Sequence, residues 1–176
     1  ARNLGIKKSN GKFIAFLDSD DLWRKNKINY QINEIKKRKL DICYSNFQTI
    51  NENKIFSYKV KLPKELNYND LLKACPICCS SIILRGQIIK KNKFSNLKTK
   101  EDYELWLRLS KKNFKFGGVN KYLTFYKIRK NSLSSHHFNK LINAFRIYYN
   151  SNNYGIVLSL LFTARLYYNA FIKKFL

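Results

Sequence analysis

The sequence has 176 residues, with 35 Lys and Arg against 11 Asp and Glu, giving a formal net charge of +24. Hydrophobic residues make up 45%, including 12 Tyr and 13 Phe, which excludes a solvated, disordered tail. No apolar run reaches the roughly 20 residues that span a bilayer. The chain begins Ala-Arg-Asn, without an initiator Met or a signal segment, so we expect it to be part of a longer protein.

The first half of the chain alternates strand and helix patterns. Residues 12–17 form a short apolar run, typical of a strand buried on both faces of a parallel sheet. Apolar residues at helical spacing predict a helix over 22–39, and residues 40–48 predict a second strand. The polar cluster at 51–53 predicts a turn.

The second half continues this alternation. A short helix is predicted over 69–74, capped by Asn69 and halted before Pro76. The remaining expected elements are a strand at 81–85, a helix at 99–112, a strand at 122–128, a polar loop at 129–135 and aromatic-rich helices over 138–176. Strands alternating with helices predict an α/β fold.

Charge and cysteines suggest two other kinds of site. The basic run from Lys36 to Lys39 ends a helical pattern, so we expect a solvated face before a ligand patch. Cys75 and Cys78 have zinc-ligand spacing, but no second pair follows at finger spacing. Reduced, partly buried thiols fit the sequence better.

An acidic cluster, Asp18-Ser19-Asp20-Asp21, directly follows the first predicted strand. Ligands of open α/β sheets bind outside the carboxyl ends of strands, and two neighbouring carboxylates can hold a hard divalent cation together with substrate phosphates. Such a cation would neutralise a diphosphate leaving group. Capping of the following helix is the alternative, but it explains one carboxylate better than three.

The surroundings of this cluster carry a family resemblance. Ala1-Arg2-Asn3-x-Gly5 precedes Gly11-Lys-Phe-Ile-Ala-Phe-Leu-Asp-Ser-Asp-Asp-x-Trp23, and Glu101-Asp-Tyr-Glu-Leu-Trp-Leu-Arg-Leu109 follows later. Both segments, in this order, resemble the two signatures of family 2 glycosyltransferases of the GT-A fold. The resemblance implies a GT-A-like (Rossmann-like) mixed sheet flanked by helices, with a C-terminal helical extension.

The resemblance also implies roles for individual residues. Asp18 and Asp20 match the Asp-x-Asp element that binds Mn²⁺ or Mg²⁺ and the nucleotide-diphosphate sugar, and Asp102 matches the catalytic base of an inverting transfer. Further substrate-binding residues are expected on the nucleotide side and around the second motif: Arg2, Asn3, Glu101, Trp106 and Arg129.

Several of these residues have an equally concrete structural interpretation. Thr99 lies three residues before Asp102, so a capping box could use the Asp102 carboxylate. Asn3 and Trp106 could be packing residues, and a solvated basic loop is the default for Arg129. Asp21 and the pair His136 and His137 are less certain neighbours of the metal.

Residues 1–135 are expected to form a partial glycosyltransferase domain that lacks its N-terminal nucleotide-binding strands. Residues 136–176 would be a helical extension, in which apolar residues such as Ile156, Leu160 and Leu161 surround a polar stripe through Arg165 and Asn169. This pattern suits a helix lying on an anionic membrane surface, or one packed on the domain itself or on a partner subunit.

The leading hypothesis is a cytoplasmic, membrane-peripheral enzyme that moves a sugar from a nucleotide diphosphate to a cell-surface glycan or lipid-linked acceptor. A nucleic-acid-binding basic module is the alternative from another class, since charge and aromatics allow it. The acidic cluster argues against it, so we expect no nucleic-acid partner. An inactive remnant of the family is the third hypothesis.

Overall fold

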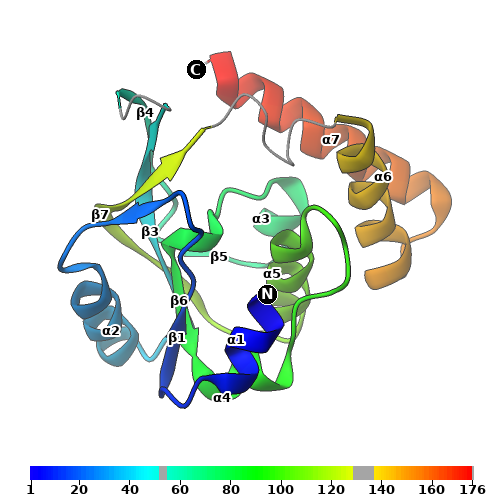
Figure 1. The fold of residues 1–176 in the computed structure, drawn as a ribbon. Helices are drawn as coiled ribbons and strands as arrows, with labels where there is room; N and C mark the ends of the chain where they lie inside the picture. Colours follow the sequence, from blue (N-terminus) through cyan, green and yellow to red (C-terminus); the bar gives the residue numbers. More distant parts are fainter. Residues whose placement is uncertain (52–54, 129–136, 176) are drawn as a thin grey trace. The chain divides into compact units, whose positions relative to one another are not determined.

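The computed structural model describes residues 1–51, 55–128 and 137–175. The chain forms two compact units that interleave along the sequence (Figure 1). The first unit consists of Ala1–Leu66, Ile77–Lys93 and Phe114–Lys130, and the second of Asn67–Pro76, Phe94–Asn113 and Asn131–Leu176. These units follow compactness, so the domain boundary expected near residue 135 stays a prediction.

The first unit is built on a seven-stranded mixed sheet. Its central order is β1-β6-β3-β7-β2, with β4 paired to β3 and β5 to β7. Only β3 and β7 run parallel; the other pairs are antiparallel. The strands are β1 Phe13–Ala15, β2 Leu22–Trp23, β3 Ile42–Ile50, β4 Phe56–Val60, β5 Glu65–Leu66, β6 Ile82–Arg85 and β7 Phe116–Lys127.

The strand β3 is the centre of this sheet because every one of its residues is buried. It pairs along its whole length with β7, from Ile42 opposite Phe116 to Ile50 opposite Lys127. Helix α2 (Lys27–Arg38) packs on β3 and β7, and an apolar core of Ile35, Leu40, Cys43 and Val119 fills the space between them. The expected mixed sheet flanked by helices is confirmed.

Three expectations for this unit need correction. Helix α2 starts at Lys27 instead of residue 22, because Leu22 and Trp23 pair with Phe125 and Thr124 as strand β2. Strand β1 pairs antiparallel with β6, so it is not the doubly buried parallel strand that its apolar run predicts. The last strand starts at Phe116, six residues before the predicted strand at 122.

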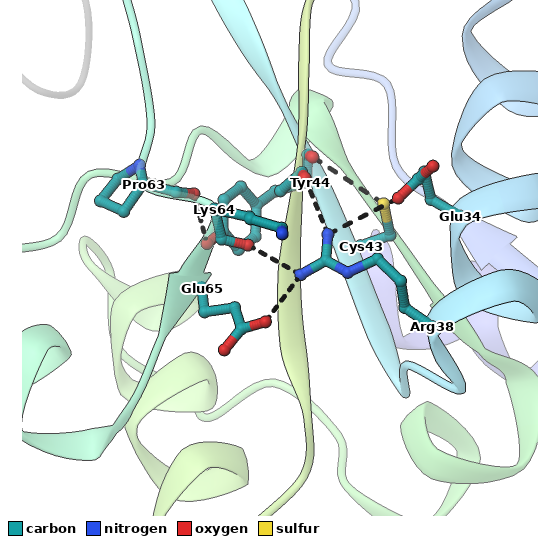
Figure 2. Close-up of polar contacts among 8 residues, drawn as sticks. Glu34, Arg38, Cys43, Tyr44, Pro63, Lys64 and Glu65 are labelled. Atoms are coloured by element: carbon teal, nitrogen blue, oxygen red, sulfur yellow. Dashed lines mark hydrogen bonds and ion pairs between the residues drawn. The ribbon is translucent and has the colours of Figure 1, made fainter.

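The end of α2 is fixed to the sheet by Arg38, a member of the run predicted to be a solvated face. Its guanidinium donates to the carbonyl oxygens of Gly118 and Lys64 (both 3.1 Å) and to the Glu65 carboxylate (3.0 Å), as Figure 2 shows for Lys64 and Glu65. The neighbouring Gly117 leaves room for the guanidinium, since a Cβ there would lie 3.1 Å from Arg38 Nη2. Arg38 therefore has a structural role, holding the end of α2 to the sheet.

The first unit also contains two short helices, α1 (Arg2–Lys8) and α4 (Gly86–Lys91). The second unit is helical: α3 (Tyr68–Lys73), α5 (Glu101–Lys111), α6 (His137–Arg146), a π-helical turn at Ile147–Ser151 and α7 (Ile156–Phe175). The cap of α3 is Asn67, not Asn69: its side chain accepts from the Asp70 amide, and Asp70 returns the bond in a capping box. No helix among the described residues is long and apolar enough to cross a membrane.

Buried tyrosines hold the second unit together. The hydroxyls of Tyr103 on α5 and Tyr148 on the π-helical turn lie 2.7 Å apart. Tyr103 also donates to the Leu71 carbonyl oxygen (2.8 Å), and Tyr148 to that of Leu72 (3.1 Å). Both rings are buried, so these contacts provide polar partners for the two hydroxyls and for carbonyl oxygens at the C-terminal end of α3.

This network generates a stability prediction. Tyr103→Phe should lower the free energy of unfolding by about 1–2 kcal/mol, because it leaves buried partners of the hydroxyl unpaired. The matched control is Tyr149→Phe, which removes a hydroxyl from an exposed ring in the same unit and should change stability by less than about 0.5 kcal/mol. Urea denaturation followed by circular dichroism measures both, and equal effects would contradict the role of the network.

Candidate functional site

The acidic cluster forms a tight turn between β1 and β2, and we call residues 18–21 the acidic loop. The Asp21 amide donates to the Asp18 carbonyl oxygen (3.0 Å), which closes the turn. Asp18 and Asp20 are partly exposed, while Asp21 is only 4% exposed. The three carboxylates, which look equivalent in the sequence, therefore stand in different surroundings.

Ser80, a fully buried residue in the turn before β6, anchors this loop. Its hydroxyl accepts from the Asp18 amide (3.0 Å) and is hydrogen-bonded to the Asp21 carboxylate. Its carbonyl oxygen accepts from the Trp23 indole N–H (2.7 Å) and from the Thr124 hydroxyl (3.4 Å). One residue thus fixes both ends of the loop.

Asp21 is the structural carboxylate of the loop. Its Oδ1 accepts from the Lys127 amide (2.9 Å) at the end of β7, and the Cys78 thiol lies 4.0 Å from Oδ2. Burial raises the pKa of Asp21, and the hydrogen bonds from Ser80 and Lys127 partly offset this shift. Asp21 therefore ties the loop to the sheet.

Asp18 lies against Arg2, as two of the predicted site residues come together here. The Arg2 guanidinium on α1 is 2.7 Å from Asp18 Oδ1, and both side chains are about one-third exposed. An ion pair this exposed contributes little stability. Asn3 is half-buried on the same helix.

The acidic loop fits a divalent cation that a substrate helps to hold. Within the described part of the chain, no group of three or more His, Cys, Asp or Glu side chains could bind a metal. Mg²⁺ and Mn²⁺ commonly take one or two carboxylates and complete their shell with water and substrate phosphates. The partly exposed carboxylates of Asp18 and Asp20 supply that donor set.

Asp102 lies in the second unit, in the first turn of α5. Its Oδ1 accepts from the Tyr103 amide (2.8 Å). The residue before the helix is Lys100, in a left-handed conformation (φ 62°) and without a side-chain cap, and Thr99 instead accepts from Asn143 (2.8 Å). The predicted capping box of Thr99 and Asp102 is therefore wrong, and the role of the partly exposed Asp102 carboxylate in the site stays a prediction.

The rest of this motif is packed. Trp106 is 0% exposed and meets Phe94 edge to face, with ring centroids 6.2 Å apart. A fully buried indole presents no face to a sugar, so packing replaces the expected substrate contact. Glu104 is buried and pairs with Arg108 (2.9 Å), while Glu101 stays partly exposed at the start of the helix.

Sequence reasoning missed the supports of the acidic loop. Ser80 precedes a predicted strand and carries no motif. Lys27 is buried, although its spacing to Gln31 and Ile35 (i, i+4, i+8) could have placed it on the inner face of α2. Arg129 and His136 lie outside the described residues.

The part of the chain that contains the acidic loop matches a known family. The model of the family described as "Glycosyl transferase family 2" matches residues 1–92, more than half of the chain. The chain belongs to glycosyl transferase family 2. The matched region contains both α1 and the acidic loop, so Arg2, Asp18 and Asp20 lie within it.

Two similar curated proteins are named as glycosyltransferases. An Escherichia coli "UDP-Glc:alpha-D-GlcNAc-diphosphoundecaprenol beta-1,3-glucosyltransferase WfaP" is 38% identical over 138 residues, which is 78% of this chain and 54% of the relative. A "putative teichuronic acid biosynthesis glycosyltransferase TuaG" from Bacillus subtilis is 31% identical over 137 residues, with 77% and 54% covered. The chain therefore spans about half the length of these family members.

A solved structure has the same fold. The structure of Staphylococcus aureus TarS residues 1–349 in complex with UDP-GlcNAc superposes with a TM-score of 0.62 at 15% sequence identity, covering 90% of this chain and 48% of TarS. At this identity the likeness shows the fold alone, and it confirms the GT-A-like architecture expected of the family.

The buried position of Asp21 generates a second stability prediction. Asp21→Ala should lower the free energy of unfolding by about 1–3 kcal/mol, because the Lys127 amide and the Ser80 hydroxyl lose their acceptor. Asp21→Asn keeps an acceptor oxygen and should cost less. Because burial raises the pKa of Asp21 above its unfolded value, the wild type should lose stability relative to Asp21→Asn as the pH rises through that pKa. Urea titrations between pH 3 and 7 would measure this, and the opposite slope would contradict it.

Proposed function

We propose that this chain belongs to an enzyme that transfers a sugar from a nucleotide-diphosphate donor to a cell-surface glycan or lipid-linked acceptor. The observation that carries the proposal is the acidic loop: Ser80 and Asp21 fix it to the sheet, while the carboxylates of Asp18 and Asp20 remain partly exposed. Membership in glycosyl transferase family 2 and the names of the E. coli and B. subtilis relatives support this substrate class.

Asp20, together with Asp18, would hold a divalent cation against the donor diphosphate. The cation, Mg²⁺ or Mn²⁺, would supply Lewis-acid stabilisation of the charge that develops on the leaving diphosphate. Arg2 orients Asp18 through their ion pair. This arrangement fixes the carboxylate positions before the donor arrives, which lowers the entropy lost on binding.

Asp102 would serve as the general base of an inverting transfer. Its carboxylate would take the proton of the acceptor hydroxyl while that oxygen forms a bond to the anomeric carbon. The bond between that carbon and the diphosphate oxygen breaks at the same time, and the nucleoside diphosphate leaves with the electron pair. The partly exposed position of Asp102 in the first turn of α5 supports this role.

Separate loss of binding and of chemistry is the expected signature of these two roles. In the complete protein, Asp20→Asn should weaken metal-dependent binding of the nucleotide sugar at least about tenfold. Asp102→Asn should leave the donor affinity unchanged and lower kcat by about 10²–10⁴-fold. Titration calorimetry with UDP-sugars and Mn²⁺, and turnover with a polyprenyl-diphosphate sugar, measure the two effects.

The control for both variants is Ser19→Ala, which changes an exposed side chain of the same loop without removing a carboxylate. It should retain the wild-type affinity and turnover. Near-normal turnover of Asp102→Asn would exclude it as the base, and undiminished metal-dependent binding by Asp20→Asn would exclude it as a ligand.

We further propose that α7 attaches the protein peripherally to the cytoplasmic membrane. Ser159, Thr163 and Leu166 form its buried side, and Asn169 donates to the Lys73 carbonyl oxygen of α3 (2.8 Å). Six apolar side chains of α7 are 48–71% exposed: Ile156, Val157, Leu158, Leu160, Leu161 and Tyr168. Within the second unit, these apolar side chains of α7 therefore remain exposed.

Charge favours an anionic lipid surface as the occupant of this face. The sequence contains no Asp or Glu after Glu104, and the exposed Arg165 follows the apolar residues on α7. Anionic lipid attracts cations near an interfacial helix, while its apolar side chains enter the headgroup boundary. Attachment would also bring the enzyme to a lipid-linked acceptor.

Vesicle binding tests this attachment at constant charge, because a net charge of +24 alone attracts any anionic surface. The double variant Val157→Ser/Leu161→Ser should bind vesicles of phosphatidylglycerol and phosphatidylcholine at least about tenfold more weakly than the wild type. The control Tyr58→Ser, on an exposed residue of β4, should bind as the wild type does. Equal binding of all three in a sedimentation assay would contradict insertion of α7.

A further inference from the structure

Lys27 is a charged residue without a polar partner in the interior of the first unit. Its side chain is 0% exposed, and its Nζ has no hydrogen-bond partner. Burial lowers the pKa of Lys27 to about 7, since an ammonium in an apolar environment loses its hydration. A helix that starts with such a residue carries a cost that a methionine or leucine would avoid.

The surroundings of Lys27 contain an aromatic face and several thiols. Its Nζ lies 4.1 Å from the centroid of the Trp23 ring. The titratable groups that influence it are Cys43, Cys78 and Cys79, and burial raises the pKa of Cys43 to about 12, so this thiol is neutral at physiological pH. The indole face is therefore the group that stabilises the ammonium, by a cation–π interaction.

Trp23 connects this buried cation to the acidic loop. Its indole N–H donates to the Ser80 carbonyl oxygen (2.7 Å), and the Ser80 hydroxyl accepts from the Asp18 amide (3.0 Å). A cation below the ring fixes the plane of the indole, and the plane determines where its N–H points. The path from Lys27 to the loop thus consists of three direct contacts.

We propose that Lys27 is a positioning residue for the acidic loop, acting through the Trp23 indole and Ser80 on Asp18. The inference rests on the proposed function, because it takes the acidic loop to be the donor site. It also gives the buried charge a physical reason: folding stability is lower with Lys27 in place, while the loop is held in one conformation.

Opposite changes in stability and in donor affinity are the expected signature. Lys27→Met fills nearly the same volume and removes the buried charge, so its Tm at pH 6 should exceed that of the wild type. The same variant should bind the UDP-sugar and Mn²⁺ about three- to tenfold more weakly, because the indole loses its cation. A residue that only supports the fold would lower the Tm and the affinity together when replaced.

A double-mutant cycle tests the path. Trp23→Phe keeps an aromatic ring above Lys27 but removes the N–H that reaches Ser80, so it should weaken donor binding at least as much as Lys27→Met. The double variant should bind no more weakly than Trp23→Phe alone, because both changes interrupt one path. Additive losses would overturn the proposal, as would wild-type affinity in Lys27→Met.

The matched control is Lys121→Met. The Nζ of Lys121 lies 4.4 Å from the centroid of the Tyr30 ring, a second cation–π contact in the same unit but on an exposed side chain. This variant should leave donor affinity unchanged; an equal loss would overturn the specific role of Lys27.

Amide hydrogen exchange separates this inference from the proposed function. Lys27→Met should accelerate exchange of the Asp18 amide, which donates to Ser80, whatever the protein binds. If the wild type binds no nucleotide sugar, the proposed function fails while faster exchange still supports the positioning role. Unchanged Asp18 exchange in Lys27→Met overturns the positioning role, even in an active glycosyltransferase.

Discussion

The buried serine at position 80 is the constraint on which the candidate site depends. Its hydroxyl and carbonyl groups connect the backbone of Asp18, the carboxylate of Asp21 and the indole of Trp23 to the start of β6. Strand β6 in turn lies between β1 and β3, so the position of the loop is fixed relative to the centre of the sheet. A metal site made of two carboxylates would need such support, because each metal–oxygen distance must stay within about 0.2 Å of its preferred value. The loop obtains that accuracy from a rigid neighbour, since it has no regular secondary structure of its own.

Two buried charges flank this site, and they act in different ways. The Asp21 carboxylate exchanges hydration for hydrogen bonds from the Lys127 amide and Ser80, so its burial is partly compensated. The Lys27 ammonium has only an aromatic face, so its burial lowers stability. Asp21 can therefore be understood as part of the fold, whereas Lys27 requires a functional explanation. This difference is why replacement of Asp21 by Ala should destabilise the protein and replacement of Lys27 by Met should not.

The fold could be predicted from the sequence where local pattern and tertiary structure agree. The strand before Asp18 follows from its apolar run. The complete burial of β3 does not, because Ser45, Asn46, Gln48 and Thr49 are buried in it as well. The start of α2 could not be predicted, because Leu22 and Trp23 continue its apolar pattern but pair with β7. The motif residues identify the candidate site in the sequence. The role of Ser80 could not be predicted, because it depends on a contact with Asp18, 62 residues away in the chain. The structural role of Arg38 could not be predicted for the same reason, because the carbonyl groups to which it donates belong to β7 and to the segment before β5.

The acidic loop in a chain of net charge +24 has an electrostatic consequence for the proposed donor. A positive field attracts a nucleotide diphosphate from a distance and raises its association rate. At short range the carboxylates of Asp18 and Asp20 repel the same diphosphate, unless a divalent cation lies between them. In the proposed function, the basic surface would favour every anion, and the loop would admit those that arrive with a metal and can complete its coordination shell. In the proposed function, selectivity for a diphosphate would then arise from the carboxylates of Asp18 and Asp20.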